Sequence, residues 1–208
     1  MLYLLSKNLL IEPFLFKFIK YVLSDVLNSG ILVQTIKHLV GRPRPSILNN
    51  ENEFSLNFDV MLNSTSFIIE LLKNKMSKGS SIVLLSSIAI KTIVDEQPLG
   101  YHVAKAGIEQ MAKFYAVALG NKGIRCNCVL PTRIIKPENY KFYNKKNNPV
   151  SSMIKKITPL NRMGTSQDVA NLVEFLSSKK SSFINGCSIP IDGGAHLQSQ
   201  ELIAKKFK

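Results

Sequence analysis

The sequence contains no tryptophan and only three cysteines in its 208 residues. Cys126, Cys128 and Cys187 are odd in number, which argues against a disulfide framework. The spacing of Cys126 and Cys128 is shorter than that of the usual zinc knuckle, so a metal site is not expected either. We interpret the cysteines as small apolar side chains in a reducing compartment, which predicts a cytoplasmic protein.

Uninterrupted apolar runs long enough to span a bilayer are also missing. The stretch from Leu9 to Leu23 is the main candidate, but Glu12, Pro13 and two lysines interrupt it. It has neither a basic amino-terminal region nor a clear cleavage site of small residues. We therefore expect no membrane span and no secretory signal.

Acidic residues are scarce, since 14 Asp and Glu face 27 Lys and Arg, for a formal net charge of +13. The lysines occur in many segments, whereas a nucleic-acid interface needs them clustered on one face. We interpret them as solvated side chains and expect no nucleic acid as partner. The 45% hydrophobic content is typical of a globular protein, and the length suits a single domain over residues 1–208.

Apolar spacing predicts helices at residues 58–75, 101–119 and 165–177, and strands at 80–87, 123–130 and 188–191. Helices that alternate with strands rich in branched residues are typical of an α/β fold with a mostly parallel sheet and helices on both faces. Residues 133–158 are polar with little periodicity, which predicts a long loop that forms a substrate lid.

Four polar residues form the candidate catalytic group: Asn63, Ser87, Tyr101 and Lys105. Tyr101 and Lys105 are four residues apart on one predicted helix, so they share a face. A nearby ammonium favours the ionised phenol, which makes Tyr101 a candidate general acid and base. Ser87 follows a strand, where parallel-sheet proteins bind ligands, and can donate a hydrogen bond to a carbonyl.

The same Tyr-x-x-x-Lys spacing also occurs at Tyr3 and Lys7, where no other candidate residue is nearby. We interpret that pair as chance. The context distinguishes Tyr101 and Lys105, because a strand that ends in Ser87 and a loop precede their helix.

Several ordered motifs carry a family resemblance. They are Tyr101-His-Val-Ala-Lys105, Gly123-Ile-Arg-Cys-Asn-Cys-Val-Leu-Pro131, Pro159-Leu-Asn-Arg-Met-Gly164 with Asp168-Val-Ala170, and Ile191-Asp-Gly-Gly194. In this order the motifs resemble those of the short-chain dehydrogenase/reductase family over residues 58–194. The resemblance implies a Rossmann-like fold.

The resemblance also implies hydride transfer between NAD or NADP and a carbonyl or secondary alcohol, with a 3-oxoacyl or sugar-type small-molecule substrate. The family residue that matches Tyr101 exchanges a proton with the substrate oxygen, and the one that matches Ser87 orients the carbonyl. The residue that matches Lys105 promotes ionisation of the tyrosine and holds the nicotinamide ribose. The residue matched to Asn63 holds a water for proton relay.

The amino-terminal part departs from the family pattern. No TGxxxGxG segment precedes residue 60, so we expect the first strand and the glycine-rich turn to be missing and residues 1–40 to be divergent. We match Asp25 to the adenine contact and Gly41 to the end of the family's NNAG segment. Further cofactor-binding candidates are Pro131, Thr132 and Ile134, although Thr132 stands in place of a glycine and Lys136 stands near the position of the family's nicotinamide-contacting threonine.

These departures leave three hypotheses. The leading one is an active oxidoreductase of this family. The second is a catalytically silent, truncated remnant that acts by binding a partner. The third, weaker one is nucleic-acid binding through the positive charge. The resemblance further implies a homo-oligomer through the helices at 58–75 and 101–119.

Overall fold

The computed structural model describes residues 31–33 and 50–207. The candidate cofactor residues Asp25 and Gly41 therefore lie outside the described residues. So do the Tyr3 and Lys7 pair and the stretch 9–23.

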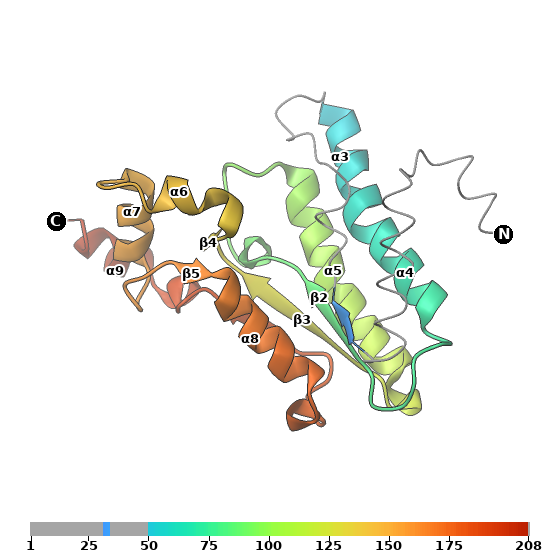
Figure 1. The fold of residues 1–208 in the computed structure, drawn as a ribbon. Helices are drawn as coiled ribbons and strands as arrows, with labels where there is room; N and C mark the ends of the chain where they lie inside the picture. Colours follow the sequence, from blue (N-terminus) through green and yellow to red (C-terminus); the bar gives the residue numbers. More distant parts are fainter. Residues whose placement is uncertain (1–30, 34–49, 208) are drawn as a thin grey trace.

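In the described part of the chain, four parallel strands form the central sheet in the order β1-β2-β3-β6 (Figure 1). They are β1 (Ile31–Val33), β2 (Ser81–Leu85), β3 (Arg125–Pro131) and β6 (Ser188–Ile191). This confirms the predicted parallel sheet and its three predicted strands. The sequence interpretation missed β1, because a run of three apolar residues is too short to separate a strand from a loop.

Side chains of the central strands alternate between two apolar clusters. Ile82 and Leu84 belong to the larger cluster, whereas Val83 between them belongs to the smaller one. In β3, Cys128 and Val129 divide in the same way. Both faces of these strands are buried, which is why their sequence is almost continuously apolar.

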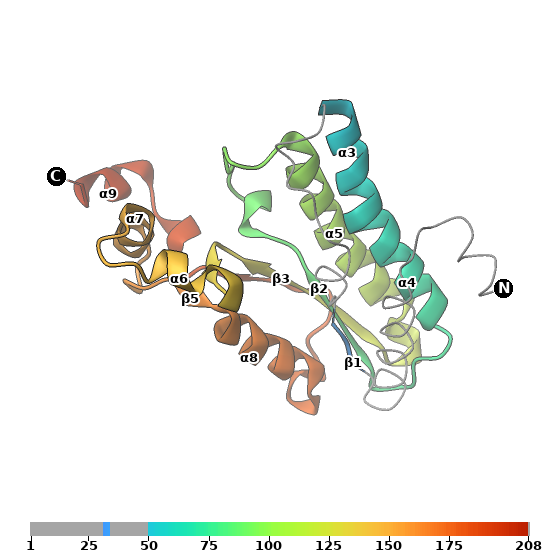
Figure 2. The ribbon, with the colours of Figure 1, turned by 45° about the horizontal axis from the view of Figure 1, so that its top comes forward.

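The helices cover the two faces of the sheet. One face packs against the π-helical turn η3 (Asp59–Asn63), α4 (Ser64–Leu72) and α5 (Leu99–Ala118). The helix α3 (Asn50–Phe58) runs directly into η3 and packs against α5. The opposite face packs against α8 (Ser166–Ser177), as the turned view shows (Figure 2). The helix predicted at 58–75 thus begins earlier in the structure, at Asn50. The prediction missed this start because the mostly polar residues of α3 have no apolar periodicity.

The segment 133–158 contains regular structure, so the expectation of a loop without it is wrong. It holds β4 (Ile134–Ile135), which pairs in parallel with β5 (Gly164–Thr165), then η6 (Pro137–Asn139), α6 (Tyr140–Tyr143) and α7 (Pro149–Ile157). A signal for α7 was present. Val150, Met153, Ile154 and Ile157 have helical spacing, and Asn148 caps the helix by accepting a hydrogen bond from the Ser151 N–H.

Short helical segments complete the described residues. They are η4 (Ile88–Ile90), η5 (Gly120–Lys122), η7 (Lys179–Ser181), η8 (Ala195–Leu197) and α9 (Gln200–Lys205). Within residues 31–33 and 50–207, no helix has both the length and the apolar character needed to cross a membrane.

Candidate active site

The candidate site lies where the parallel strands β2, β3 and β6 end. Because parallel strands have the same direction, their carboxyl ends meet at one edge of the sheet, which is where open α/β sheets bind ligands. Ser87 follows β2, Thr132 follows β3 and Asp192 follows β6.

Two serines join the end of β2 to the helices beside it. Ser86 is buried, and its hydroxyl donates a hydrogen bond of 2.7 Å to the Lys105 carbonyl in α5. Ser87 caps η4, because its hydroxyl oxygen accepts a hydrogen bond of 3.2 Å from the Ala89 N–H. That bond uses the oxygen as acceptor, so the Ser87 hydroxyl proton is available to a ligand.

The structure brings Tyr101 and Lys105 together on α5. The Lys105 side chain is buried, with 1% of its surface exposed, and its Nζ lies 5.7 Å from the centre of the Tyr101 ring. Nζ also donates a hydrogen bond of 2.9 Å to the Leu85 carbonyl at the end of β2. Among the described residues, the Tyr101 hydroxyl makes no hydrogen bond. The phenol is therefore available to an external oxygen, with a fixed positive charge beside its ring.

Asn63 is placed differently. It is the last residue of η3, it is exposed, and its amide donates a hydrogen bond of 2.7 Å to Asp59 Oδ1 on the same helix. No hydrogen bond joins its side chain to Ser87, Tyr101 or Lys105 in the described part of the chain. Its role in a proton relay stays a prediction.

The remaining cofactor candidates lie at the end of β3 and just after it. Pro131 is the last residue of that strand, the Thr132 N–H donates a hydrogen bond of 3.2 Å to the Ile191 carbonyl, and Ile134 lies in β4. Lys136, which stands near the position of the family's threonine, forms an ion pair of 3.7 Å with Glu138.

A buried aspartate at the end of β6 and its half-buried histidine partner were not among the predicted site residues. Asp192 is 6% exposed and accepts hydrogen bonds from the Gly194 N–H, the His196 N–H and His196 Nδ1, the last at 2.6 Å. Burial alone would raise the pKa of Asp192, but the bonds from His196 and Gly194 outweigh it and lower that pKa below its usual range. The sequence signal was an aspartate before two glycines, both of which have positive φ.

His102 holds the loop between β2 and α5. Its Nδ1 lies 2.9 Å from the Ala89 carbonyl oxygen, and its Nε2 lies 3.2 Å from that of Val94. The ring is half-buried against this loop.

The thiols offer no sign of metal chemistry. Burial raises the pKa of the Cys126 and Cys128 thiols to about 12, so both are protonated at neutral pH. In the part of the chain that the structure describes, no three His, Cys, Asp or Glu side chains are grouped so that they could hold a metal ion.

Comparison with known proteins agrees with this geometry. Residues 31–196 match the family model described as Enoyl-(Acyl carrier protein) reductase. The chain is 32% identical over 146 residues to an L-rhamnose 1-dehydrogenase (NAD(P)(+)) of Sphingomonas sp. (strain SKA58), a match that covers 69% of this chain and 56% of the relative. It is 40% identical over 114 residues to a (3R)-3-hydroxyacyl-CoA dehydrogenase of Mus musculus, which covers 55% and 42%.

Among solved structures, a short-chain dehydrogenase/reductase from Burkholderia xenovorans has a TM-score of 0.69 and 25% identity, over 87% of this chain and 71% of that chain. The parallel sheet with helices on both faces defines a Rossmann-like α/β protein. The chain belongs to the short-chain dehydrogenase/reductase family. It spans about half the length of the curated relatives it matches.

Proposed function

We propose that this chain is part of an NAD(P)-dependent oxidoreductase that interconverts a carbonyl and a secondary alcohol. The observation that carries the proposal is the buried Lys105 ammonium beside the Tyr101 ring, at the sheet edge where Ser87 follows the end of β2. A phenol, an ammonium and a hydroxyl at this edge suit proton exchange with a carbonyl oxygen.

Each of the three side chains has a distinct task in this proposal. The Ser87 hydroxyl donates a hydrogen bond to the substrate carbonyl and orients it. The Tyr101 hydroxyl gives its proton to the oxygen during reduction and takes it back during oxidation. The Lys105 ammonium stabilises the phenolate that forms. Asn63 is proposed to hold the water that returns the proton.

The described residues suit the nicotinamide end of a dinucleotide. Lys105 and the Tyr101 hydroxyl would hold the nicotinamide ribose, and the chain at Pro131, Thr132 and Ile134 would line the nicotinamide. The bound cofactor, NAD or NADP, supplies or accepts the hydride. The candidates for its adenine end, Asp25 and Gly41, lie outside the described residues.

The relatives support a small-molecule substrate. The Sphingomonas relative is named for a sugar and NAD(P)(+), and the mouse relative for a hydroxyacyl thioester. Both names describe oxidation of an alcohol carbon, which is the chemistry that the serine, tyrosine and lysine can assist.

Turnover of a carbonyl substrate by the wild-type chain and by Tyr101→Phe tests the proposal. We expect the variant to lose at least about 100-fold in kcat, because it loses the proton donor, while NADPH or NADH still binds through the remaining contacts, Lys105 among them. Phe114→Tyr, on the exposed side of α5, is the matched control and should keep its activity. Equal activity in Tyr101→Phe would contradict the assignment. A chain that binds neither reduced cofactor would instead support the catalytically silent remnant.

We also propose that the chain is a homo-oligomer that uses α4 and α5. Large apolar side chains are exposed on both helices: Phe67 and Leu71 are 54% and 45% exposed, and Phe114 and Val117 are 63% and 83% exposed. Neighbouring apolar side chains of this size usually mark an interface. Sedimentation at equilibrium should give a dimer or larger species that Phe114→Glu shifts to the monomer.

The proposed setting is one domain in the cytoplasm. The free thiols of Cys126, Cys128 and Cys187 support a reducing compartment. Limited proteolysis that yields a single stable core would support one domain, and two separable cores would contradict it.

A further inference from the structure

The positive charge of the described residues is concentrated in the segment 133–158. This segment carries seven Lys and Arg and one Glu, whereas the rest of the described residues carries thirteen basic and eleven acidic side chains. A general excess of lysine would spread the charge over the whole surface. The local excess therefore marks one part of the molecule as attractive to anions.

Four lysines of this segment have no acidic partner among the described residues. Arg133 pairs with Glu96, and Lys136 pairs with Glu138. The Lys156 Nζ lies 4.4 Å from the centre of the Phe207 ring. The others are exposed, and we name them the basic face: Lys141, Lys145, Lys146 and Lys155.

The basic face stands on a defined scaffold. Asn148 donates a hydrogen bond of 2.7 Å to the Phe142 carbonyl, and the Ser151 hydroxyl donates one of 2.5 Å to the Tyr143 carbonyl. These bonds join α7 to α6, so the lysines of both elements keep a common arrangement. Two aromatic rings of α6 lie among these lysines in the sequence and are exposed, Tyr140 by 57% and Phe142 by 55%.

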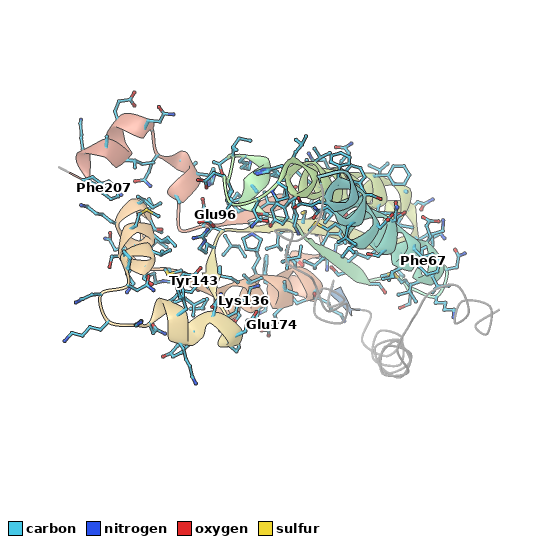
Figure 3. All side chains as sticks on the ribbon, turned by 90° about the horizontal axis from the view of Figure 1, so that it is seen from above. Phe67, Glu96, Lys136, Tyr143, Glu174 and Phe207 are labelled. Atoms are coloured by element: carbon cyan, nitrogen blue, oxygen red, sulfur yellow. The ribbon has the colours of Figure 1, made fainter. Side chains whose placement is uncertain are left out.

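The position of the basic face relates it to the candidate site. The segment leaves β3 immediately after Thr132, and α6 and α7 lie beyond the carboxyl ends of the strands (Figure 1). Seen from above, Tyr143 and Phe207 lie on one side of the molecule, and Phe67 of the proposed oligomer face lies on the other (Figure 3). The elements α6 and α7, which carry or flank the basic face, thus lie beyond the catalytic edge and away from Phe67.

We propose that the basic face binds the nucleotide end of an acyl thioester substrate whose carrier contains phosphates and adenine, as in coenzyme A. This inference rests on the proposed function, because the acyl carbonyl of the same molecule must reach Ser87 and Tyr101. Lysines bind phosphates as point charges, and an exposed ring at Tyr140 or Phe142 can stack on adenine. In such a substrate a long arm separates the nucleotide from the acyl carbonyl. The nucleotide could therefore lie on the basic face while the carbonyl lies at Ser87 and Tyr101.

The first test compares two substrates with the same 3-oxoacyl group, one on coenzyme A and one on the short thiol N-acetylcysteamine. The variant is Lys145→Glu with Lys146→Glu. The control is Lys179→Glu with Lys180→Glu. These two exposed lysines are adjacent in the sequence, lie in η7 outside the basic face, and give the same change of charge. We expect the ratio of kcat/KM for the long over the short substrate to fall about tenfold in the variant only. An unchanged ratio, or an equal fall in the control, would overturn the proposal.

The second test measures binding without turnover, so that it separates this proposal from the proposed function. Calorimetric titration with coenzyme A alone should show binding that weakens with salt and is lost in the Lys145 and Lys146 variant. Binding without any carbonyl turnover would support the basic face and count against the oxidoreductase. Absence of binding would overturn the proposal, as would tighter binding of a single-stranded oligonucleotide that the same variant abolishes.

Discussion

Replacement of Arg125 by methionine tests how the sheet holds the helix on its second face. The guanidinium is buried, with 8% of the residue exposed, at the start of β3. It donates to the carbonyls of Leu176 at 2.8 Å, Ser178 at 3.1 Å and Ile184 at 3.5 Å. These carbonyls end α8 and lead into β6, so one side chain fixes that connection to the sheet.

The expected magnitude follows from those contacts. Hydrogen bonds from a charged donor contribute ~1.5–3 kcal/mol each, and the bond at 3.5 Å is weak. Burial also lowers the pKa of Arg125, which shows that its desolvation offsets part of the gain. We expect Arg125→Met to lower the free energy of unfolding by about 3 kcal/mol. This would move the urea midpoint down by about 1–2 M.

Arg162→Met is the matched control. Arg162 makes a bidentate pair with Asp168 at 2.9 and 2.7 Å, but its side chain is 53% exposed. Its loss should cost only about 0.5–1 kcal/mol. Urea unfolding followed by circular dichroism compares the two variants. If Arg125→Met cost no more than Arg162→Met, the structural role given to the buried guanidinium would be refuted.

Two further predictions concern Asp168 and His102. The hydrogen bonds from Arg162 hold the pKa of Asp168 well below its usual range, so Asp168 stabilises the fold above the unfolded pKa and loses this effect as pH falls through the folded one. The difference in unfolding free energy between the wild type and Asp168→Asn should therefore shrink from pH ~6 to pH ~3, and a constant difference would contradict it. Because the His102 ring nitrogens face the carbonyls of Ala89 and Val94, His102→Phe should lower the free energy of unfolding by ~1–2 kcal/mol. It should also speed amide hydrogen exchange in the loop after β2, measured by mass spectrometry. Unchanged exchange would contradict the role of His102 in holding this loop.

Local patterns in the sequence were enough to predict much of the fold. The branched run of β2 predicted a buried strand, and the spacing of Tyr101 and Lys105 predicted a shared helix face. The period of α5 depends only on neighbours within a few turns, so it is visible without tertiary structure. The prediction for 133–158 failed because the apolar spacing of α7 covers only nine residues between polar ones.

Other features depend on contacts between distant residues. The carbonyls that Arg125 binds are more than fifty positions away in the chain, and nothing near Arg125 indicates them. The π-helical turn η3 looks like ordinary helix in a residue pattern. The contacts of His102 depend on the course of a loop that has no sequence periodicity. The partners of its ring nitrogens therefore could not be predicted from the sequence.

The most direct measurement is a fluorescence titration of the chain with NADH and with NADPH, repeated on Lys105→Met. We expect saturable binding of at least one reduced cofactor to the wild type, weakened about tenfold or more when the buried ammonium is removed. Binding that is equal in both proteins, or no binding to either, would contradict the placement of the nicotinamide ribose beside Tyr101 and Lys105.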